Sequence, residues 1–373
     1  MPDFGVYLHV PFCLSKCPYC DFCSFPGSSD DERERYVGAL IREIGERDFP
    51  PRKATSVFFG GGTPTLLSAA QFDALLSMIA ARFPLSEDAE ITFEMNPATA
   101  DRKKLRALRS IGFNRVSIGC QSTSDDELSA LGRAHAAEEI FEAYEDALAA
   151  GFSNINLDLM YGIPRQTVGS FVETLKTVIS MCPDHVSAYG LILEEGTPFY
   201  ARRKELQLPG EDAEADMYAL ASSTLREAGY RHYEISNYAR PGFECRHNLL
   251  YWRQGEYAAY GLSASSHIGG VRRTNTRSLA RYLAAPTSAT EEETVIEGAD
   301  AAYEYIMLAL RLSEGIDEAY YRRRFGRSFR ESYADRLAPW FMRGLLVSDG
   351  KRTALTDEGL YLQSALLREL LPL

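Results

Sequence analysis

Four closely spaced cysteines near the start of this 373-residue chain are its strongest chemical signal. Cys13, Cys17 and Cys20 follow a C-x3-C-x2-C pattern, and Cys23 comes shortly after them. Thiolates select zinc, copper(I) or iron–sulfur clusters, and no second Cys or His pair stands at zinc-ribbon distance. We predict a [4Fe–4S] cluster on the first three thiolates, with one iron left open for a substrate or cofactor. Inert buried thiols or zinc are the alternatives, and Cys23 is expected not to be a ligand.

Alternating strands and helices follow the cysteine segment. Short connections between such elements predict a parallel sheet with right-handed crossovers. Six strands in place of eight predict an open, partial (β/α)6 barrel with a gap that could admit a large substrate. The expected strands are 5–11, 56–59, 90–94, 115–119, 154–159 and 185–189, and the helices between them are 30–47, 69–83, 101–110, 137–149 and 168–180.

Glycines and polar residues stand near the carboxyl ends of these strands, where (β/α) barrels carry their chemistry. The glycines let backbone approach a ligand closely, and a carboxylate can pair with a cation or accept from ribose hydroxyls. Taken singly, each position also suits a turn, a helix cap or a structural hydrogen bond. The candidates are Gly61, Gly62, Thr63, Glu94, Gln121, Arg133, Asp158 and Gly190. Tyr19, between Cys17 and Cys20, is a further candidate that could pack against an adenine ring, with ordinary loop packing as its alternative.

A second group of candidate residues lies far along the chain, in the segment 245–252. His247 offers an iron ligand beside the flat side chains of Tyr251 and Trp252, and haem iron takes His, Cys, Met or Tyr ligands. The alternative is a histidine that bonds a backbone carbonyl within an aromatic patch. The basic runs at 272–273 and 322–324 suit solvated faces, although the carboxylates of a tetrapyrrole need a few such arginines. Weaker ligand candidates are His232, Cys245 and His267.

Composition narrows the class of protein. A formal charge of −12 argues against nucleic acid as the main partner, because phosphate backbones demand a basic surface. No apolar run approaches the ~20 residues that a membrane span needs, and the first residues lack the pattern of a signal peptide. Seven cysteines without a paired framework suit reduced thiols, which predicts a cytoplasmic protein.

The regular alternation ends after residue 195. A helix at 211–228 and a strand at 230–237 are expected, followed by a small, polar and acidic linker at 285–294. Beyond it, helices at 301–312, 329–344 and 357–370 and an Asp-Gly hairpin at 346–353 predict a small helical, winged-helix-like domain. We therefore expect two domains, a barrel with an extension of its sheet at 1–285 and a C-terminal domain at 296–373.

Together these motifs resemble the oxygen-independent coproporphyrinogen III oxidase family of radical S-adenosylmethionine (SAM) proteins, and most closely its HemW branch of haem chaperones. The similarity covers the cysteine segment, 60–64, 94–97, 115–122, 158–167, 247–252 and the C-terminal region. It implies three cofactors, namely a [4Fe–4S] cluster, SAM and haem, with His247 as the haem ligand. The positions that match SAM contacts are Tyr7, Tyr19, Gly61, Gly62, Thr63, Glu94, Gln121, Arg133, Asp158 and Gly190.

Two departures separate the chain from the oxidases. Their fourth cysteine is replaced by Phe22, with Cys23 one position later, and only twelve residues precede Cys13, where the oxidases carry a covering extension. The resemblance therefore implies a haem chaperone. Coproporphyrinogen oxidation or another radical reaction on a tetrapyrrole are the alternatives, and whether the protein is an enzyme is left open. Implied partners are haem, a haem-acceptor protein and a reductant such as flavodoxin or ferredoxin, with peripheral membrane association and a homodimer as further expectations.

Overall fold

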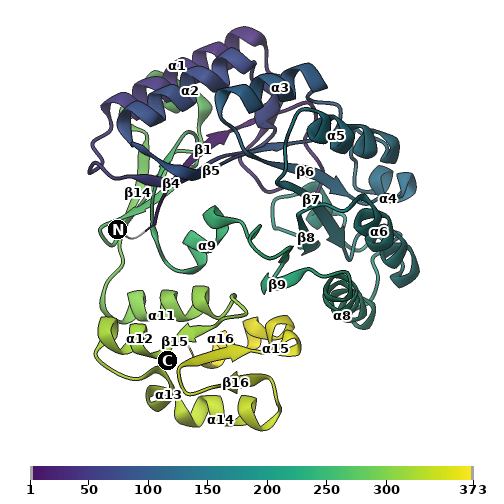
Figure 1. Ribbon diagram of the computed structural model, residues 1–373, viewed down its shortest axis with the longest axis vertical. Helices are drawn as coiled ribbons and strands as arrows, with labels where there is room; N and C mark the ends of the chain where they lie inside the picture. The colour runs from purple at the N-terminus through teal and green to yellow at the C-terminus, as the bar shows by residue number, and fades with distance from the viewer. Residues whose placement is uncertain (1–2, 371–373) are drawn as a thin grey trace.

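The computed structural model describes residues 3–370, and a curved sheet of twelve strands dominates it (Figure 1). Six neighbouring strands are parallel and follow chain order, which confirms the predicted partial barrel. Their carboxyl ends therefore meet at one rim. These strands are β1 (Phe4–Val10), β4 (Ala54–Gly61), β5 (Leu85–Met95), β6 (Arg115–Gln121), β7 (Ile155–Tyr161) and β8 (His185–Gly190).

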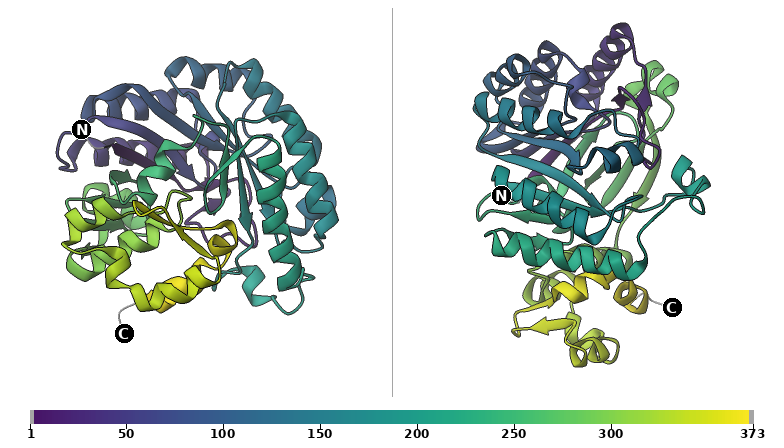
Figure 2. Two further views of the ribbon diagram at one scale, coloured as in Figure 1. Left: turned by 60° about the horizontal axis from the view of Figure 1, so that its bottom comes forward. Right: turned by 90° about the vertical axis from the view of Figure 1, so that its right-hand side faces the viewer.

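Helices cover the outer face of this sheet in an arc (Figure 2, left). Side-chain caps fix where several of them begin, since Ser29, Ser68, Asp101 and Thr167 each accept a hydrogen bond from the backbone N–H of the helical residue three positions on. The helices are α1 (Asp30–Glu46), α2 (Ala69–Arg82), α3 (Arg102–Ile111), α4 (Asp125–Ala130), α5 (Ala137–Ala149) and α6 (Val168–Met181).

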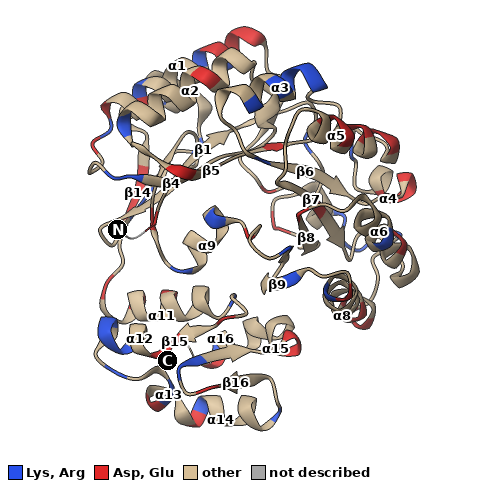
Figure 3. Cartoon of the chain, in the orientation of Figure 1, with Lys and Arg blue, Asp and Glu red and all other residues tan. Residues whose placement is uncertain are grey.

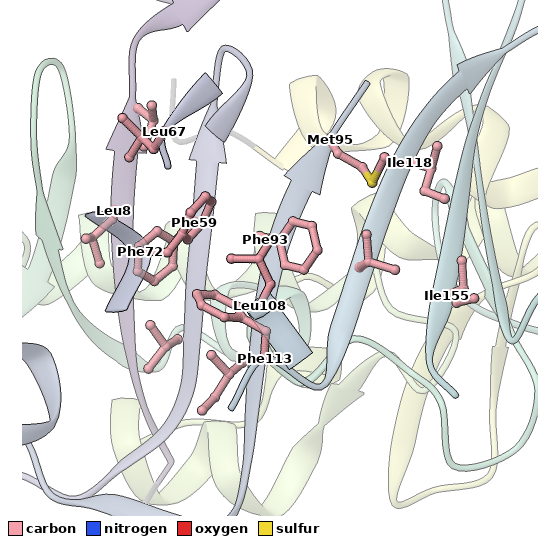
Figure 4. Close-up of a cluster of buried hydrophobic side chains, with 14 of the residues drawn as sticks. Leu8, Phe59, Leu67, Phe72, Phe93, Met95, Leu108, Phe113, Ile118 and Ile155 are labelled. Carbon is pink, nitrogen blue, oxygen red and sulfur yellow. The ribbon is translucent and has the colours of Figure 1, made fainter. Parts of the chain in front are cut away.

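Interlocked phenylalanines fill the layer between sheet and helices (Figure 4). Phe113 meets the rings of Phe59, Phe72 and Phe93 nearly edge-on, with centroids 5.2–5.4 Å apart. Edge-to-face pairs of this kind stabilise by ~0.5–1.5 kcal/mol each beyond their burial. All four side chains are fully buried. The cluster holds β4 and β5 in register and thereby positions the strand ends that carry Gly61 and Glu94.

Strands from the second half of the chain extend the sheet at both edges. β11 (Glu256–Tyr260) pairs in parallel with β1, and β12 (Ser265–Ile268), β13 (Val271–Asn275) and β14 (Thr290–Val295) continue antiparallel. At the other edge β10 (Asn237–Ala239) and β9 (Arg231–Glu234) pair antiparallel beyond β8. The single strand expected at 230–237 is therefore wrong, because the chain reverses after Glu234.

The linker expected at 285–294 is also wrong. After a short turn, η2 (Pro286–Ser288), the acidic residues form edge strand β14, which pairs with β13. Ion pairs of Glu293 with Arg273 and of Glu291 with Arg281, each at 2.8 Å, hold it. Charged side chains protect an exposed sheet edge from pairing with other chains. An edge strand built in this way has the same acidic composition as a linker, so the sequence alone does not tell the two apart. The sheet unit therefore extends to residue 295.

The C-terminal unit is built around a second buried cluster of Tyr305, Tyr321, Leu337 and Trp340, which Tyr218 from the first part of the chain also joins. As expected it combines helices with a small antiparallel sheet, although the helices expected at 329–344 and 357–370 each break into two. The run of arginines on its second helix is exposed, as predicted (Figure 3). The elements are α11 (Gly298–Ala309), β15 (Ile316–Asp317), α12 (Glu318–Phe325), α13 (Phe329–Ser332), α14 (Ala334–Met342), β16 (Leu346–Ser348), β17 (Arg352–Leu355), α15 (Asp357–Tyr361) and α16 (Gln363–Leu370).

Polar contacts tie this unit to helix α8 (Glu211–Glu227) of the first one. Asp357 accepts hydrogen bonds from Arg226 at 2.6 Å and from Ser222 at 3.0 Å. Between the two units lies helix α9 (Arg246–Trp252), which packs against β1, β4 and α11 (Figure 1). Two short helices, α7 (Pro198–Ala201) and α10 (Leu279–Ala284), complete the fold. No helix within residues 3–370 is long and apolar enough to cross a membrane.

Candidate cluster and cofactor site

The three clustered cysteines lie on a loop that leaves β1 and is pinned at both ends. Cys13 ends the short strand β2 (Phe12–Cys13), which pairs with β3 (Phe25–Pro26) where the loop returns. Between them the Cys20 N–H donates to the Cys17 carbonyl at 3.1 Å, and the Lys16 ammonium donates to the Phe22 carbonyl at 3.0 Å. None of the seven cysteines forms a disulfide. Within residues 3–370, no three Cys, His, Asp or Glu side chains are grouped to hold a single metal ion.

Gly62 sits against this loop so closely that no side chain fits there. A Cβ atom at Gly62 would lie 2.6 Å from the Phe12 carbonyl oxygen and 2.9 Å from Cys13 Sγ. Its N–H donates to the Val10 carbonyl at 2.8 Å. The glycine run therefore lets the backbone after β4 lie directly beside the first cysteine, as predicted from its composition.

The Glu94 side chain, near the end of β5, reaches the backbone of the glycine run after β4. Its Oε2 accepts a hydrogen bond from the Gly61 N–H at 3.1 Å. Burial, assisted by the neighbouring Asp158 charge, raises the pKa of Glu94 to about 8. A cation bound beside Glu94 would therefore convert its carboxyl group to the carboxylate.

Asp158 belongs to a polar network on the adjacent strands β6 and β7. It accepts from Ser117 Oγ at 3.1 Å and from Asn156 Nδ2 at 2.8 Å. Burial raises its pKa, while these hydrogen bonds to the carboxylate act in the opposite direction. Gln121, at the end of β6, has φ +69° and follows a register shift against β7. Such irregularities re-aim side chains at functional sites.

Arg133 crosses from the loop after α4 to the cysteines. Its Nη1 lies 3.6 Å from Cys17 Sγ and 3.5 Å from the Tyr19 hydroxyl. Its Nη2 donates to the Gly119 carbonyl at 3.1 Å and to Asn96. The guanidinium thus supplies positive charge beside the Cys17 sulfur, and its buried Nε has no protein partner.

Most of the sequence-predicted residues line one cavity of about 360 Å³, here called the cluster cavity. Three of the candidate SAM contacts lie outside its lining. Thr63 is buried and accepts from Asn96 Nδ2 at 2.9 Å, Gly190 faces the Tyr161 ring, and Tyr7 bonds His9 Nδ1 at 3.1 Å. The cluster cavity is defined by Cys13, Cys17, Tyr19, Cys20, Gly61, Gly62, Glu94, Gln121, Arg133 and Asp158 together with residues that sequence reasoning missed, among them Asn96, Arg115, Ser117, Ser187 and Tyr189.

Of the missed residues, Arg115 is the most unusual. It is only 2% exposed, and its Nε has no hydrogen-bond partner. A charged residue opening the apolar strand at 115–119 was the available signal. For Asn96 the available signal was its position two residues after Glu94, because the carboxyl ends of parallel strands converge.

A second cavity, of about 570 Å³, opens between the sheet extension and the C-terminal unit. We call it the lateral cavity. Phe22, Gly61 and Glu94 line both cavities, so the two are adjacent. Cys23 lines the lateral cavity and not the cluster cavity, which supports the prediction that it is no cluster ligand. The lateral cavity is lined by Tyr7, His9, Asp21, Phe22, Cys23, Gly61, Glu94, Tyr251, Trp252, Gln254, Gly255, Tyr257, Ser263, Ala264, Ser265, His267, Arg272, Arg277, Glu304 and Leu308.

His247 lines neither cavity, although Tyr251 and Trp252 of the same helix line the lateral one. Its ring is 1% exposed, with Nδ1 2.9 Å from Ser56 Oγ and Nε2 2.8 Å from the Tyr251 hydroxyl. Burial, and to a lesser degree Arg115, lowers its pKa to about 3. Both ring nitrogens are thus engaged, and the role of His247 as haem ligand stays a prediction.

Comparison with known proteins identifies two family regions. Residues 7–178 match the radical SAM superfamily and residues 296–362 match the HemN C-terminal domain. The curated relatives include proteins named heme chaperone HemW. That of Mycobacterium tuberculosis is 38% identical over 99% of this chain and 95% of its own length, and that of Lactococcus lactis is 35% identical over 95% and 94%. The HemW of Escherichia coli is 37% identical over 84% of each chain.

The solved structures add a full-length match. Coproporphyrinogen III oxidase (HemN) of Escherichia coli superposes with a TM-score of 0.86 and 26% identity, covering 99% of this chain and 90% of its own. Membership of the radical SAM superfamily implies a [4Fe–4S] cluster and SAM, and the cysteine loop with the cluster cavity offers the thiolates and polar groups that these cofactors need. The chain belongs to the HemW family of radical SAM proteins.

Proposed function

We propose that this protein is a haem chaperone, which binds haem and delivers it to acceptor proteins. The observation that carries the proposal is the lateral cavity, which combines aromatic walls with two arginines and shares Phe22, Gly61 and Glu94 with the cluster cavity. A flat, dianionic tetrapyrrole suits such a cavity. The proteins named heme chaperone HemW, which match over almost the whole chain, support the same function.

In this proposal Cys13, Cys17 and Cys20 hold the [4Fe–4S] cluster and leave one iron for SAM. The cluster, when bound, supplies one electron to SAM. Glu94 and the backbone of Gly61 and Gly62 receive the amino end of SAM. Gln121, Arg133 and Asp158 supply further hydrogen bonds, and Tyr19 offers a flat face to the adenine. Tyr7, Thr63 and Gly190, which do not line the cluster cavity, are the remaining proposed SAM-contacting positions.

Reduced thiols and an iron–sulfur cluster favour the cytoplasm as the compartment. A small reductant such as flavodoxin or ferredoxin is the proposed electron donor, and the acceptors are proteins that require haem. We further propose that residues 296–373 form a unit of their own, on the ground that most of one hydrophobic cluster comes from residues 302–370.

The alternative function is oxidation of coproporphyrinogen III, and the full-length likeness to the oxidase favours it. Phe22 argues against it, because it stands where the oxidases carry a cysteine; it is 64% exposed and lines both cavities. The two functions differ in what happens to the tetrapyrrole, which is decarboxylated by an oxidase and passed on unchanged by a chaperone.

The test is anaerobic reconstitution with iron and sulfide, followed by two assays on the same preparation. We expect haem to bind, as followed by its Soret band, and to pass to apomyoglobin as a probe acceptor. We expect coproporphyrinogen III to remain unconverted in the presence of SAM and reductant. Conversion to protoporphyrinogen would overturn the chaperone assignment in favour of the oxidase. Failure to bind haem at all would overturn both the assignment and the proposed use of the lateral cavity.

A further inference from the structure

The C-terminal unit contributes two residues, Glu304 and Leu308, to the lining of the lateral cavity. Glu304 of α11 reaches across to β13, where its Oε2 accepts from Arg272 Nη1 at 2.9 Å and its Oε1 from Arg272 Nη2 at 3.1 Å. Oε1 also accepts from Gln254 Nε2 at 3.0 Å. The Glu304 side chain is 12% exposed, and both of its oxygens are therefore engaged by the fork of one arginine.

This two-point contact indicates which ligand chemistry Arg272 recognises. A guanidinium fork matches the two oxygens of a carboxylate, and the match is the same for a side chain and for a bound ligand. Glu304 thus occupies the position that a ligand carboxylate would take on Arg272. A second cation of the cavity, Arg277, forms no ion pair within residues 3–370, and its Nη2 donates to the Asp21 carbonyl at 3.3 Å. The cavity therefore offers two arginines for two carboxylates, of which one is paired with the protein itself.

Glu304 is also the carboxylate that competes most directly with such a ligand. The other carboxyl groups in the lining belong to Asp21, which is exposed, and to Glu94. Burial, assisted by the Asp158 charge, raises the pKa of Glu94 to about 8, so this group is mainly neutral near pH 7. Of the three carboxyl groups in the described lining, only that of Glu304 is paired with one of the two arginines.

An exchange of Glu304 for a ligand carboxylate would disturb little else. The Arg272 guanidinium would remain paired, and two further contacts would still hold the end of α9 against the C-terminal unit. Gln254 Nε2 donates to the Ala301 carbonyl at 3.4 Å, and Arg253 pairs with Glu314 at 3.0 Å. A ligand bound in this way competes with a carboxylate of the protein itself, which lowers its affinity and favours its release.

We propose that Glu304 is a displaceable partner of Arg272. One haem carboxylate takes the place of Glu304 on Arg272, Arg277 receives the other, and the return of Glu304 promotes release of haem to the acceptor. The inference rests on the proposed function, since it takes haem as the ligand and a chaperone must give up what it binds. It concerns only the carboxylates of haem and leaves the iron with its predicted ligand, His247.

The test is Glu304→Gln in the reconstituted protein, which keeps the shape of the side chain but removes its charge. We expect haem to bind about two- to tenfold more tightly, in line with the loss of one partly exposed charged competitor, and to pass to apomyoglobin more slowly by a similar factor. Haem dimethyl ester, which has no free carboxylates, should bind the variant and the original chain equally. Retained binding of the ester shows that the cavity is intact. Unchanged or weaker binding of haem would then overturn the inference, as would an equal gain for haem and its ester.

Two further variants separate this exchange from a general loosening of the fold. Glu314→Gln removes the ion pair with Arg253, a contact of the C-terminal unit that lies outside the lateral cavity, and should leave haem affinity unchanged. Glu304→Gln combined with Arg272→Gln should bind haem no more tightly than Arg272→Gln alone, because the first change acts only by freeing Arg272. A gain in Glu314→Gln, or a gain that persists without Arg272, would overturn the inference. If the original chain bound no haem at all, the proposed function itself would fail, which is a distinguishable outcome.

Discussion

The Gly61 N–H donates a hydrogen bond to Glu94 Oε2 across a distance of 3.1 Å, and both residues line the cluster cavity and the lateral cavity. The contact joins the ends of β4 and β5 at the boundary between the proposed SAM site and the proposed haem site. Because burial raises the pKa of Glu94 to about 8, its charge state depends on whether a cation binds in these cavities.

SAM binding is expected to release a proton from Glu94. Below pH 8 the carboxyl is mainly protonated, and pairing with the SAM ammonium requires the carboxylate. Affinity should therefore rise with pH between about 6 and 7.5, by up to about tenfold per pH unit. Isothermal titration in buffers of different ionisation enthalpy measures both the affinity and the proton released.

Glu94→Gln is the matched variant for this experiment. It keeps the acceptor for the Gly61 N–H but loses the charge. SAM affinity should fall by about ten- to a hundredfold near pH 7.5, as expected for a hydrogen bond to a charged group, and the proton release should vanish. A variant that still releases one proton per SAM would show that another group titrates.

Cluster content should depend on three cysteines and not on the fourth. Cys13→Ala, Cys17→Ala and Cys20→Ala should each lose most of the iron and sulfide after anaerobic reconstitution, because each removes one of three thiolates. Cys23→Ala should retain them, since Cys23 lines the other cavity. Exposed Cys182 provides the control variant Cys182→Ala. Equal loss in Cys23→Ala would argue for a fourth thiolate ligand.

Gly62→Ala tests the close approach of backbone and cluster loop. The added methyl would stand 2.9 Å from Cys13 Sγ, so the loop must shift, and we expect reconstituted iron to fall at least severalfold. Gly45→Ala is the control, because its Cβ meets nothing within 4 Å and it lies in α1, where alanine stabilises by ~0.5–1 kcal/mol. Normal cluster content in Gly62→Ala would refute the argument.

Arg272 should recognise a carboxylate of the porphyrin. Arg272→Gln is expected to weaken haem binding by about tenfold, in line with the loss of one charge-assisted hydrogen bond. Haem dimethyl ester, which lacks free carboxylates, should bind Arg272→Gln and the original chain equally. Arg273→Gln is the control, since Arg273 pairs with Glu293 and does not line the lateral cavity. Equal weakening for the acid and the ester would point to a packing effect.

Glu43 should be the most costly carboxylate to remove from the fold. Fully buried on α1, it accepts from the Gly261 N–H at 2.8 Å, Tyr282 at 2.6 Å and Asn275 at 2.8 Å, and it pairs with Arg47 at 2.7 Å. Glu43→Ala leaves Arg47, whose side chain is 10% exposed, without its carboxylate partner, and breaking such a pair costs about 3–5 kcal/mol. Urea unfolding measures the loss, with exposed Glu46→Ala as control. A change below about 1 kcal/mol would contradict this role.

The strand ends could be predicted because parallel strands place their carboxyl ends together. Gly61, Glu94, Gln121 and Asp158 could therefore be brought to one cavity from the order of strands and helices alone. The spacing of the cysteines also predicted a metal-binding loop at the same rim of the sheet. These residues could be predicted because each belongs to a short motif or stands directly after an apolar strand.

The residues that were missed depend on contacts between distant segments. The acidic stretch 290–295 has the composition of a linker, and only pairing with Arg273 and Arg281 makes it a strand. In the same way, the sequence places His247 beside Tyr251 and Trp252, but it does not show which groups bond its ring. The hydrogen bonds to Ser56 and Tyr251 form only when the chain folds.

Strand β1 pairs with β4 on one side and with β11 on the other, and Tyr7 faces Phe58 in one register and Ala259 in the other. During synthesis the second partner emerges roughly 250 residues after the first strand. Contacts of such long range slow folding, so β1, and the loop that leaves it, keep an open edge until most of the chain has been translated. In a nascent chain that lacks β11, the cysteine loop would follow a strand paired on one side only. We therefore expect stable insertion of the cluster after release from the ribosome.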